Sequence, residues 1–112
     1  MKMKIVNKNT FLQMPNNTVY SKYKPYIFGE LCIKGKTVEN DFYYQEISSA
    51  QLCDYGTYFD ALFFAERDEI SFTFDFNCEG RDAMLDEHQL FAVWEQADVL
   101  ALIARLQQTI KI

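Results

Sequence analysis

Two hydrophobic periodicities occur in this chain, and together they restrict it to a fold that combines helices with an antiparallel sheet. From Ile70 to Asn77, apolar and polar residues alternate strictly, as in a strand with one face on a core and one face in water. Toward the C-terminus, apolar residues instead recur at the spacing of one helical stripe. They are Val99, Leu102, Ile103, Leu106 and Ile110. The two patterns predict an α+β fold.

Capping and turn residues place the other elements. Residues 7–14 are predicted to form a short helix, which an Asn or Thr of this segment can cap and which Pro15 ends. β-forming residues and turn signals predict strands at 18–23, 26–34, 41–47, 70–77 and 89–95, and a middle helix at 58–66. Lys34-Gly35-Lys36 supplies the turn of a hairpin. We therefore expect residues 1–112 to form a single α+β domain, an antiparallel sheet of about five strands with three helices packed on it.

The cysteines and the apolar segments bear on the cellular compartment. Cys32, Cys53 and Cys78 are odd in number and widely spaced, which favours reduced thiols over a disulfide framework. The N-terminus lacks the apolar region of a signal peptide, and no apolar run reaches the roughly 18–20 residues that span a bilayer. We expect a cytoplasmic protein that does not bind a membrane.

Charge is distributed very unevenly along the chain. Residues 1–36 contain seven lysines and one acid, whereas residues 37–100 contain fifteen acids and two arginines. The acidic segment would repel phosphates, so we expect no direct binding to nucleic acid. The basic first third could meet the acidic region within one molecule or in a second copy, so the charges also allow a homodimer.

The acids are densest between residues 66 and 98, where ten acids face two arginines. One interpretation is a surface that keeps the chain soluble. The other is an interface that pairs with the Arg and Lys of a partner, as nucleic acid would. The candidate interface acids are Glu66, Asp68, Glu69, Asp75, Glu79, Asp82, Asp86 and Glu87. Tyrosines that could anchor such an interface are Tyr43, Tyr44, Tyr55 and Tyr58.

The segment from residue 75 to residue 86 partly matches a calcium-binding loop. Asp75, Asn77, Glu79 and Asp86 occupy its first, third, fifth and twelfth positions, and Gly80 the sixth. The twelfth position requires a bidentate Glu, and a strand rather than a helix precedes the loop. A solvated acidic turn is therefore the simpler interpretation, and we expect no metal or other cofactor.

Other catalytic chemistry has few candidates. His88 is the only histidine, and a nucleophile pair with Cys78 would lack a third group that orients it. We therefore expect a protein without enzymatic activity. The enzymatic alternative is metal-assisted chemistry on Asp75, Asn77, Glu79, Asp82, Asp86 and His88.

Two stretches resemble small bacteriophage and prophage proteins. One is Thr18 to Pro25, after the helix with Phe11 and Leu12, and the other joins Gly80-Arg81-Asp82 to the run from Gln89 to Val99. The resemblance covers most of the chain and implies a phage-side role like that of anti-CRISPR proteins, which bind a defence nuclease or its guide complex. It implies an acidic inhibitor of a host defence or nucleic-acid-binding protein. An immunity protein that neutralises a basic toxin is the alternative.

Overall fold

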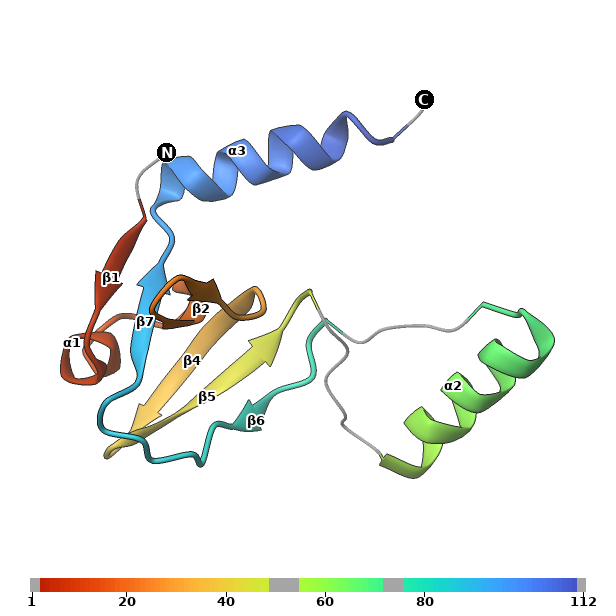
Figure 1. Ribbon diagram of the computed structural model, residues 1–112, viewed down its shortest axis with the longest axis horizontal. Coiled ribbons are helices and arrows are strands. Elements are labelled where there is room, and N and C mark those ends of the chain that lie inside the picture. Colours follow the sequence, from red (N-terminus) through yellow and green to blue (C-terminus); the bar gives the residue numbers. More distant parts are fainter. Residues whose placement is uncertain (1–2, 49–54, 72–75, 111–112) are drawn as a thin grey trace.

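The structure is a computed structural model that describes residues 3–48, 55–71 and 76–110, without the side chains of residues 55–58. Helices alternate with groups of short strands along the chain, which confirms the predicted α+β class (Figure 1). In chain order the elements are β1 (Lys4–Val6), α1 (Lys8–Leu12), β2 (Val19–Lys24), β3 (Ile27–Phe28), β4 (Cys32–Val38), β5 (Asp41–Glu46), α2 (Tyr55–Asp68), β6 (Gly80–Arg81), β7 (Leu90–Val93) and α3 (Gln96–Gln107).

The strands form one antiparallel sheet. Its order is β1-β7-β2-β4-β5-β6, and β3 pairs with β2 beside this path. Strand β2 pairs with β7 from Tyr20 to Tyr23, with β4 at its first residues and with β3 at its last. The described residues thus hold seven strands rather than about five. The difference arises because β1, β3 and β6 are two or three residues long, too short to show a periodicity.

An aromatic core lies between α1 and the sheet. Phe11 of α1 is fully buried, and its ring stacks on Phe91 of β7 with 3.9 Å between the ring centroids. Tyr20 of β2 and Phe42 of β5 meet Phe11 edge-on at 4.7 and 5.0 Å. The capping residue is Asn7, one of the Asn and Thr candidates, and its Oδ1 accepts a hydrogen bond from the Thr10 N–H at 2.9 Å. The cap and the core together hold α1 on the sheet.

The segment predicted as a hairpin turn is part of strand β4. Lys34 is buried there, and its Nζ donates hydrogen bonds to the Gly35 carbonyl at 3.0 Å and to Thr37 Oγ1 at 2.7 Å. Burial lowers the pKa of Lys34. The actual turn lies between Val38 and Asp41, which are paired across the hairpin. The prediction of the turn is wrong because the glycine serves close packing, since a Cβ at Gly35 would lie 3.1 Å from the Tyr43 Cβ and 3.3 Å from the Tyr43 carbonyl oxygen.

An ion pair fastens β6 to the start of β5. Arg81 Nε donates to Asp41 Oδ2 at 2.8 Å, and the Ala83 N–H donates to Asp41 Oδ1 at 3.0 Å. Burial alone would raise the pKa of Asp41, but the hydrogen bonds from Arg81 and from backbone N–H groups outweigh it and hold that pKa below its usual value. Gly80 and Arg81, which lie within the segment interpreted from sequence as a solvated acidic turn, therefore form a paired strand at the edge of the sheet.

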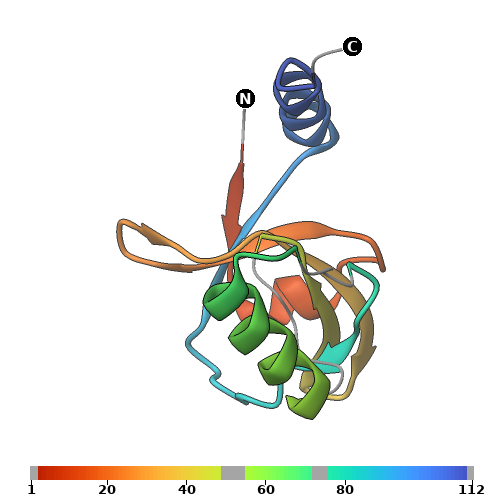
Figure 2. The same cartoon turned by 90° about the vertical axis from the view of Figure 1, so that its right-hand side faces the viewer.

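Helices α2 and α3 confirm the predicted middle and C-terminal helices, but they do not lie on the sheet. Figures 1 and 2 show both helices projecting from it, on different sides of the molecule. The radius of gyration of the Cα atoms is 15.9 Å, whereas a compact chain of this length would have about 13 Å. The apolar faces of both helices are consequently exposed.

The alternating segment from Ile70 to Asn77 also differs from its prediction. Ile70 and Ser71 lie outside any strand, and Phe76 lies in a turn. Both Ile70 and Phe76 are exposed, so the prediction that these two side chains face the core is wrong. Residues 72–75 lie outside the described part of the chain. Two-residue periodicity therefore did not identify a core strand at either end of this segment.

Candidate binding surfaces

Helix α2 exposes an aromatic patch, here called the α2 patch, formed by Phe59, Phe63 and Phe64. These side chains are 59, 59 and 42% exposed. The rings of Phe63 and Phe64 meet edge-on with 5.6 Å between their centroids, and the Arg67 guanidinium lies 5.5 and 4.9 Å from them. The sequence did not indicate this patch, because aromatic residues at helical spacing are most often core residues.

Acidic side chains accompany the α2 patch on the same helix and just after it. Those with exposed positions are Asp60, Glu66, Asp68 and Glu69. The single arginine nearby, Arg67, already donates two hydrogen bonds of 2.9 Å to the Asp68 carboxylate. The surface therefore combines apolar aromatic area with a surplus of negative charge, which suits an apolar groove lined with Lys or Arg.

The other predicted interface acids lie elsewhere. Glu79 is exposed just before β6, and Asp86 and Glu87 are exposed in the segment before β7. Figure 1 places β6 and this segment far from the C-terminal end of α2. Asp82 is mostly buried, because its Oδ1 pairs with Lys22 Nζ at 2.6 Å. Asp75 lies outside the described residues. The predicted acids therefore form separate groups and not one continuous face.

The predicted tyrosine anchors are only partly described. Tyr43 and Tyr44 of β5 are half-buried, and Tyr43 lies beneath the Arg81 guanidinium, 5.6 Å from it. The side chains of Tyr55 and Tyr58 are outside the described part. Tyr43 and Tyr44 are thus engaged within the sheet, and the exposed aromatic area that the structure describes on α2 belongs to phenylalanines.

A small polar cleft of about 160 Å³ opens beside the sheet core. Its lining residues are Tyr20, Lys22, Glu30, Cys32, Tyr44, Glu46 and Asp82. Burial, with added repulsion from Glu46 and Glu30, raises the pKa of the Cys32 thiol to about 12. The thiol is therefore protonated near neutral pH, and it is a poor nucleophile.

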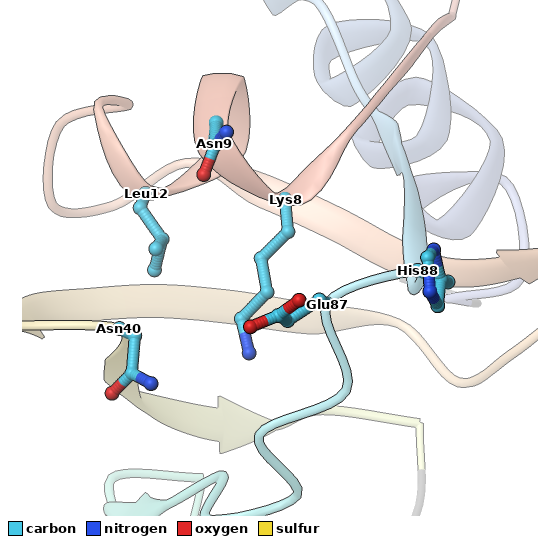
Figure 3. A pocket seen from close by; sticks show the side chains of 6 residues that line it. All are labelled: Lys8, Asn9, Leu12, Asn40, Glu87 and His88. Carbon is cyan, nitrogen blue, oxygen red and sulfur yellow. The ribbon is translucent and has the colours of Figure 1, made fainter.

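A second cleft of about 370 Å³ contains the single histidine (Figure 3). Lys8 and Leu12 reach into it from α1, Asn40 lies on the turn before β5, and Glu87 and His88 come from the segment before β7. The predicted pair of His88 with Cys78 does not provide a nucleophile, because Cys78 is disulfide-bonded.

The disulfide also corrects the prediction that the cysteines are reduced. Cys78 is bonded, whereas Cys32 is free and buried. Spacing along the sequence does not determine which sulfur atoms a fold brings together, so the prediction is wrong for Cys78. Disulfides are more common in oxidising compartments than in the cytosol. The cytoplasmic location therefore stays a prediction, and this bond weighs against it.

The described residues offer no metal site. Within residues 3–48, 55–71 and 76–110, no three His, Cys, Asp or Glu side chains gather in a way that could hold a metal ion. The candidates Asn77, Glu79 and Asp86 fall within these ranges, and Asp75 does not. None of the helices in the described part combines the length and the apolar character that a membrane span requires.

Comparisons with protein-family models, with curated proteins and with solved structures find no match to this chain.

Proposed function

We propose that this chain is a binding protein without enzymatic activity, and that α2 docks it on the basic surface of another protein. The observation that carries the proposal is the α2 patch, three exposed phenylalanines beside acids on a helix that stands off the sheet. Exposed apolar patches with polar rims mark interaction sites in soluble proteins.

The apolar part of this surface is large enough to centre an interface. Phe side chains bury roughly 150–250 Å² each, so the exposed fractions of Phe59, Phe63 and Phe64 amount to roughly 300 Å². At about 25 cal/mol per Å², their burial is worth roughly 8 kcal/mol before the costs of association. Aromatic clusters of this kind are the usual hot spots of protein interfaces.

The charges around the α2 patch narrow the class of partner. Glu66 near the end of α2 and Glu69 just after it are exposed acids. A partner surface that is electrostatically complementary to them must be cationic. Proteins that bind nucleic acid carry such surfaces, because they neutralise phosphates with Lys and Arg. We therefore propose a host defence or nucleic-acid-binding protein as the target, with this chain as its inhibitor. Their contact would weaken as salt screens the charges.

The experiment is an affinity pull-down from host lysate with matched variants of the full chain. Phe63→Ser with Phe64→Ser removes the apolar centre, and Glu66→Gln with Glu69→Gln removes two charges. The control, Asp86→Asn with Glu87→Gln, removes two exposed charges far from α2. Wild type and control should retain one host protein at about 0.1 M salt and release it at about 0.5 M, where screening is strong.

Both α2 variants should lose this protein, and circular dichroism should show that they remain folded. The retained protein, once purified, should bind the Glu66→Gln, Glu69→Gln variant roughly tenfold more weakly than wild type at low salt, and the difference should shrink at high salt. Equal capture by all four proteins, or a loss that follows the control variant instead, would refute α2 as the docking helix.

A further inference from the structure

Helix α3 exposes large apolar side chains along much of its length. Leu100, Ile103 and Leu106 are 57, 46 and 54% exposed, and Ile110, just after the turn that follows the helix, is 62% exposed. Asp98 is buried at the N-terminus, where its carboxylate accepts a hydrogen bond from the Glu95 N–H at 3.0 Å. Helices with this composition are normally covered by protein.

The apolar residues of α3 follow a heptad spacing. Within α3, Val99, Ile103 and Leu106 are separated by four and three residues, which is the spacing of the seam by which helices pair in coiled coils, and Ile110 follows four residues later, just beyond the helix. The opposite face carries small or polar side chains: Ala97, Ala101, Ala104, Arg105 and Gln108. The apolar stripe of the helix can therefore pack against a second helix, while the opposite face remains in contact with water.

We infer that this stripe pairs with α3 of a second copy of the chain, and that α3 is a dimerisation helix. The inference does not rest on the function proposed for α2. The positions that flank the seam are Leu100, Leu102, Gln107 and Thr109, and all are uncharged. Two identical copies therefore meet without like-charge repulsion, whereas a partner with a basic surface would find no acid there. Strongly apolar interfaces are typical of homodimers.

The exposed area agrees with a weak dimer. The side chains of Leu100, Ile103, Leu106 and Ile110 each expose about half of their surface, on the order of 100 Å² per side chain. Two copies would bury on the order of 800 Å² of this apolar area, and the flanking residues bring the contact to about 1,000 Å², the lower limit of specific interfaces. Interfaces at this lower limit are typical of weak complexes, so we expect a dissociation constant on the order of micromolar or weaker.

The test is the mass of the full chain in solution, measured by light scattering across a concentration series. Wild type should approach twice the 13.2 kDa of one chain as its concentration rises to about 200 µM. Ile103→Glu, which puts a charge in the exposed seam, should remain at the mass of one chain. The matched control Ala101→Glu puts the same charge on the opposite face and should dimerise as wild type does.

Three results would overturn the inference. They are a wild-type mass of one chain throughout the series, equal dimerisation of Ile103→Glu and wild type, and an assembly larger than two chains. Circular dichroism of each variant shows whether it is folded. Because α2 is unchanged, Ile103→Glu should still retain the host protein captured through α2, so the two proposals can fail separately.

Discussion

Replacement of Phe11 by alanine should remove the centre of the aromatic core. Phe11 is the residue through which the five-residue helix α1 is held on the sheet, and its ring contacts three others. The substitution leaves a cavity between Phe91, Tyr20 and Phe42, which stand on three different strands. Strands fixed in one hydrogen-bonded sheet can close this cavity only in part.

The expected loss in the free energy of unfolding is about 4 kcal/mol, from the usual cost of Phe→Ala at fully buried sites. A domain of this size has a total stability of roughly 5–15 kcal/mol. With a urea dependence of about 2 kcal/mol per M, the unfolding midpoint should fall by about 2 M. If wild type lies at the lower end of that range, about 1 kcal/mol would remain, and the variant would be only marginally folded in water.

Urea unfolding followed by far-UV circular dichroism measures this loss. The matched control is Phe63→Ala, the same chemical change at a side chain that is 59% exposed, and its loss should stay within about 0.5–1 kcal/mol. A loss below about 1 kcal/mol for Phe11→Ala, or equal losses for the two variants, would refute the assignment of the core.

Three further predictions concern buried polar groups. The pKa of Asp41 is lowered in the folded state, so its ion pair stabilises the fold above the unfolded pKa of about 3.9 and is lost as pH falls through the folded pKa. Asp41→Asn should therefore cost roughly 1–3 kcal/mol at pH 7 and much less near pH 3 in urea unfolding, and a loss that is independent of pH would contradict this. Burial lowers the pKa of Lys34, so the contribution of Lys34 to stability, taken as the difference between wild type and the Lys34→Met variant, should rise as pH approaches about 10. In thermal unfolding scans Lys34→Met should be neutral or stabilising at pH 7, and a strong destabilisation would show that the ammonium is required. The buried Cys32 thiol, with its pKa raised to about 12, should react with a thiol reagent at pH 8 only after unfolding, and rapid reaction of the native protein would refute its burial.

The parts of the fold that could be predicted from sequence have strong local signals. Asn and Thr residues that can cap a helix, and Pro15 that ends it, located α1 because such residues act on the backbone directly. The stripe from Val99 to Leu106 located α3 in the same way. Gly35 led to the wrong prediction of a hairpin turn. The sequence does not distinguish a glycine needed for a turn from one needed for close packing, which here is packing beside Tyr43.

The candidate sites were harder to predict because they depend on where the elements lie. The phenylalanines of α2 have the spacing of a core face, and a spacing does not say what covers that face. The acids from Glu66 to Glu87 are close in sequence, yet α2 and the segment before β7 lie at separate places in the molecule. Asp82 also forms an ion pair with Lys22, sixty positions away in the chain, so its mostly buried carboxylate is not available to an interface.

The most direct test of the account is small-angle X-ray scattering of the Ile103→Glu variant at low concentration. Both proposals require that α2 and α3 stand away from the sheet and keep their apolar faces available. We expect a radius of gyration close to the 15.9 Å of the structure, together with a scattering mass equal to that of a single chain. A value near 13 Å, that of a compact chain of this length, would show both helices folded onto the sheet and would contradict both proposed interfaces.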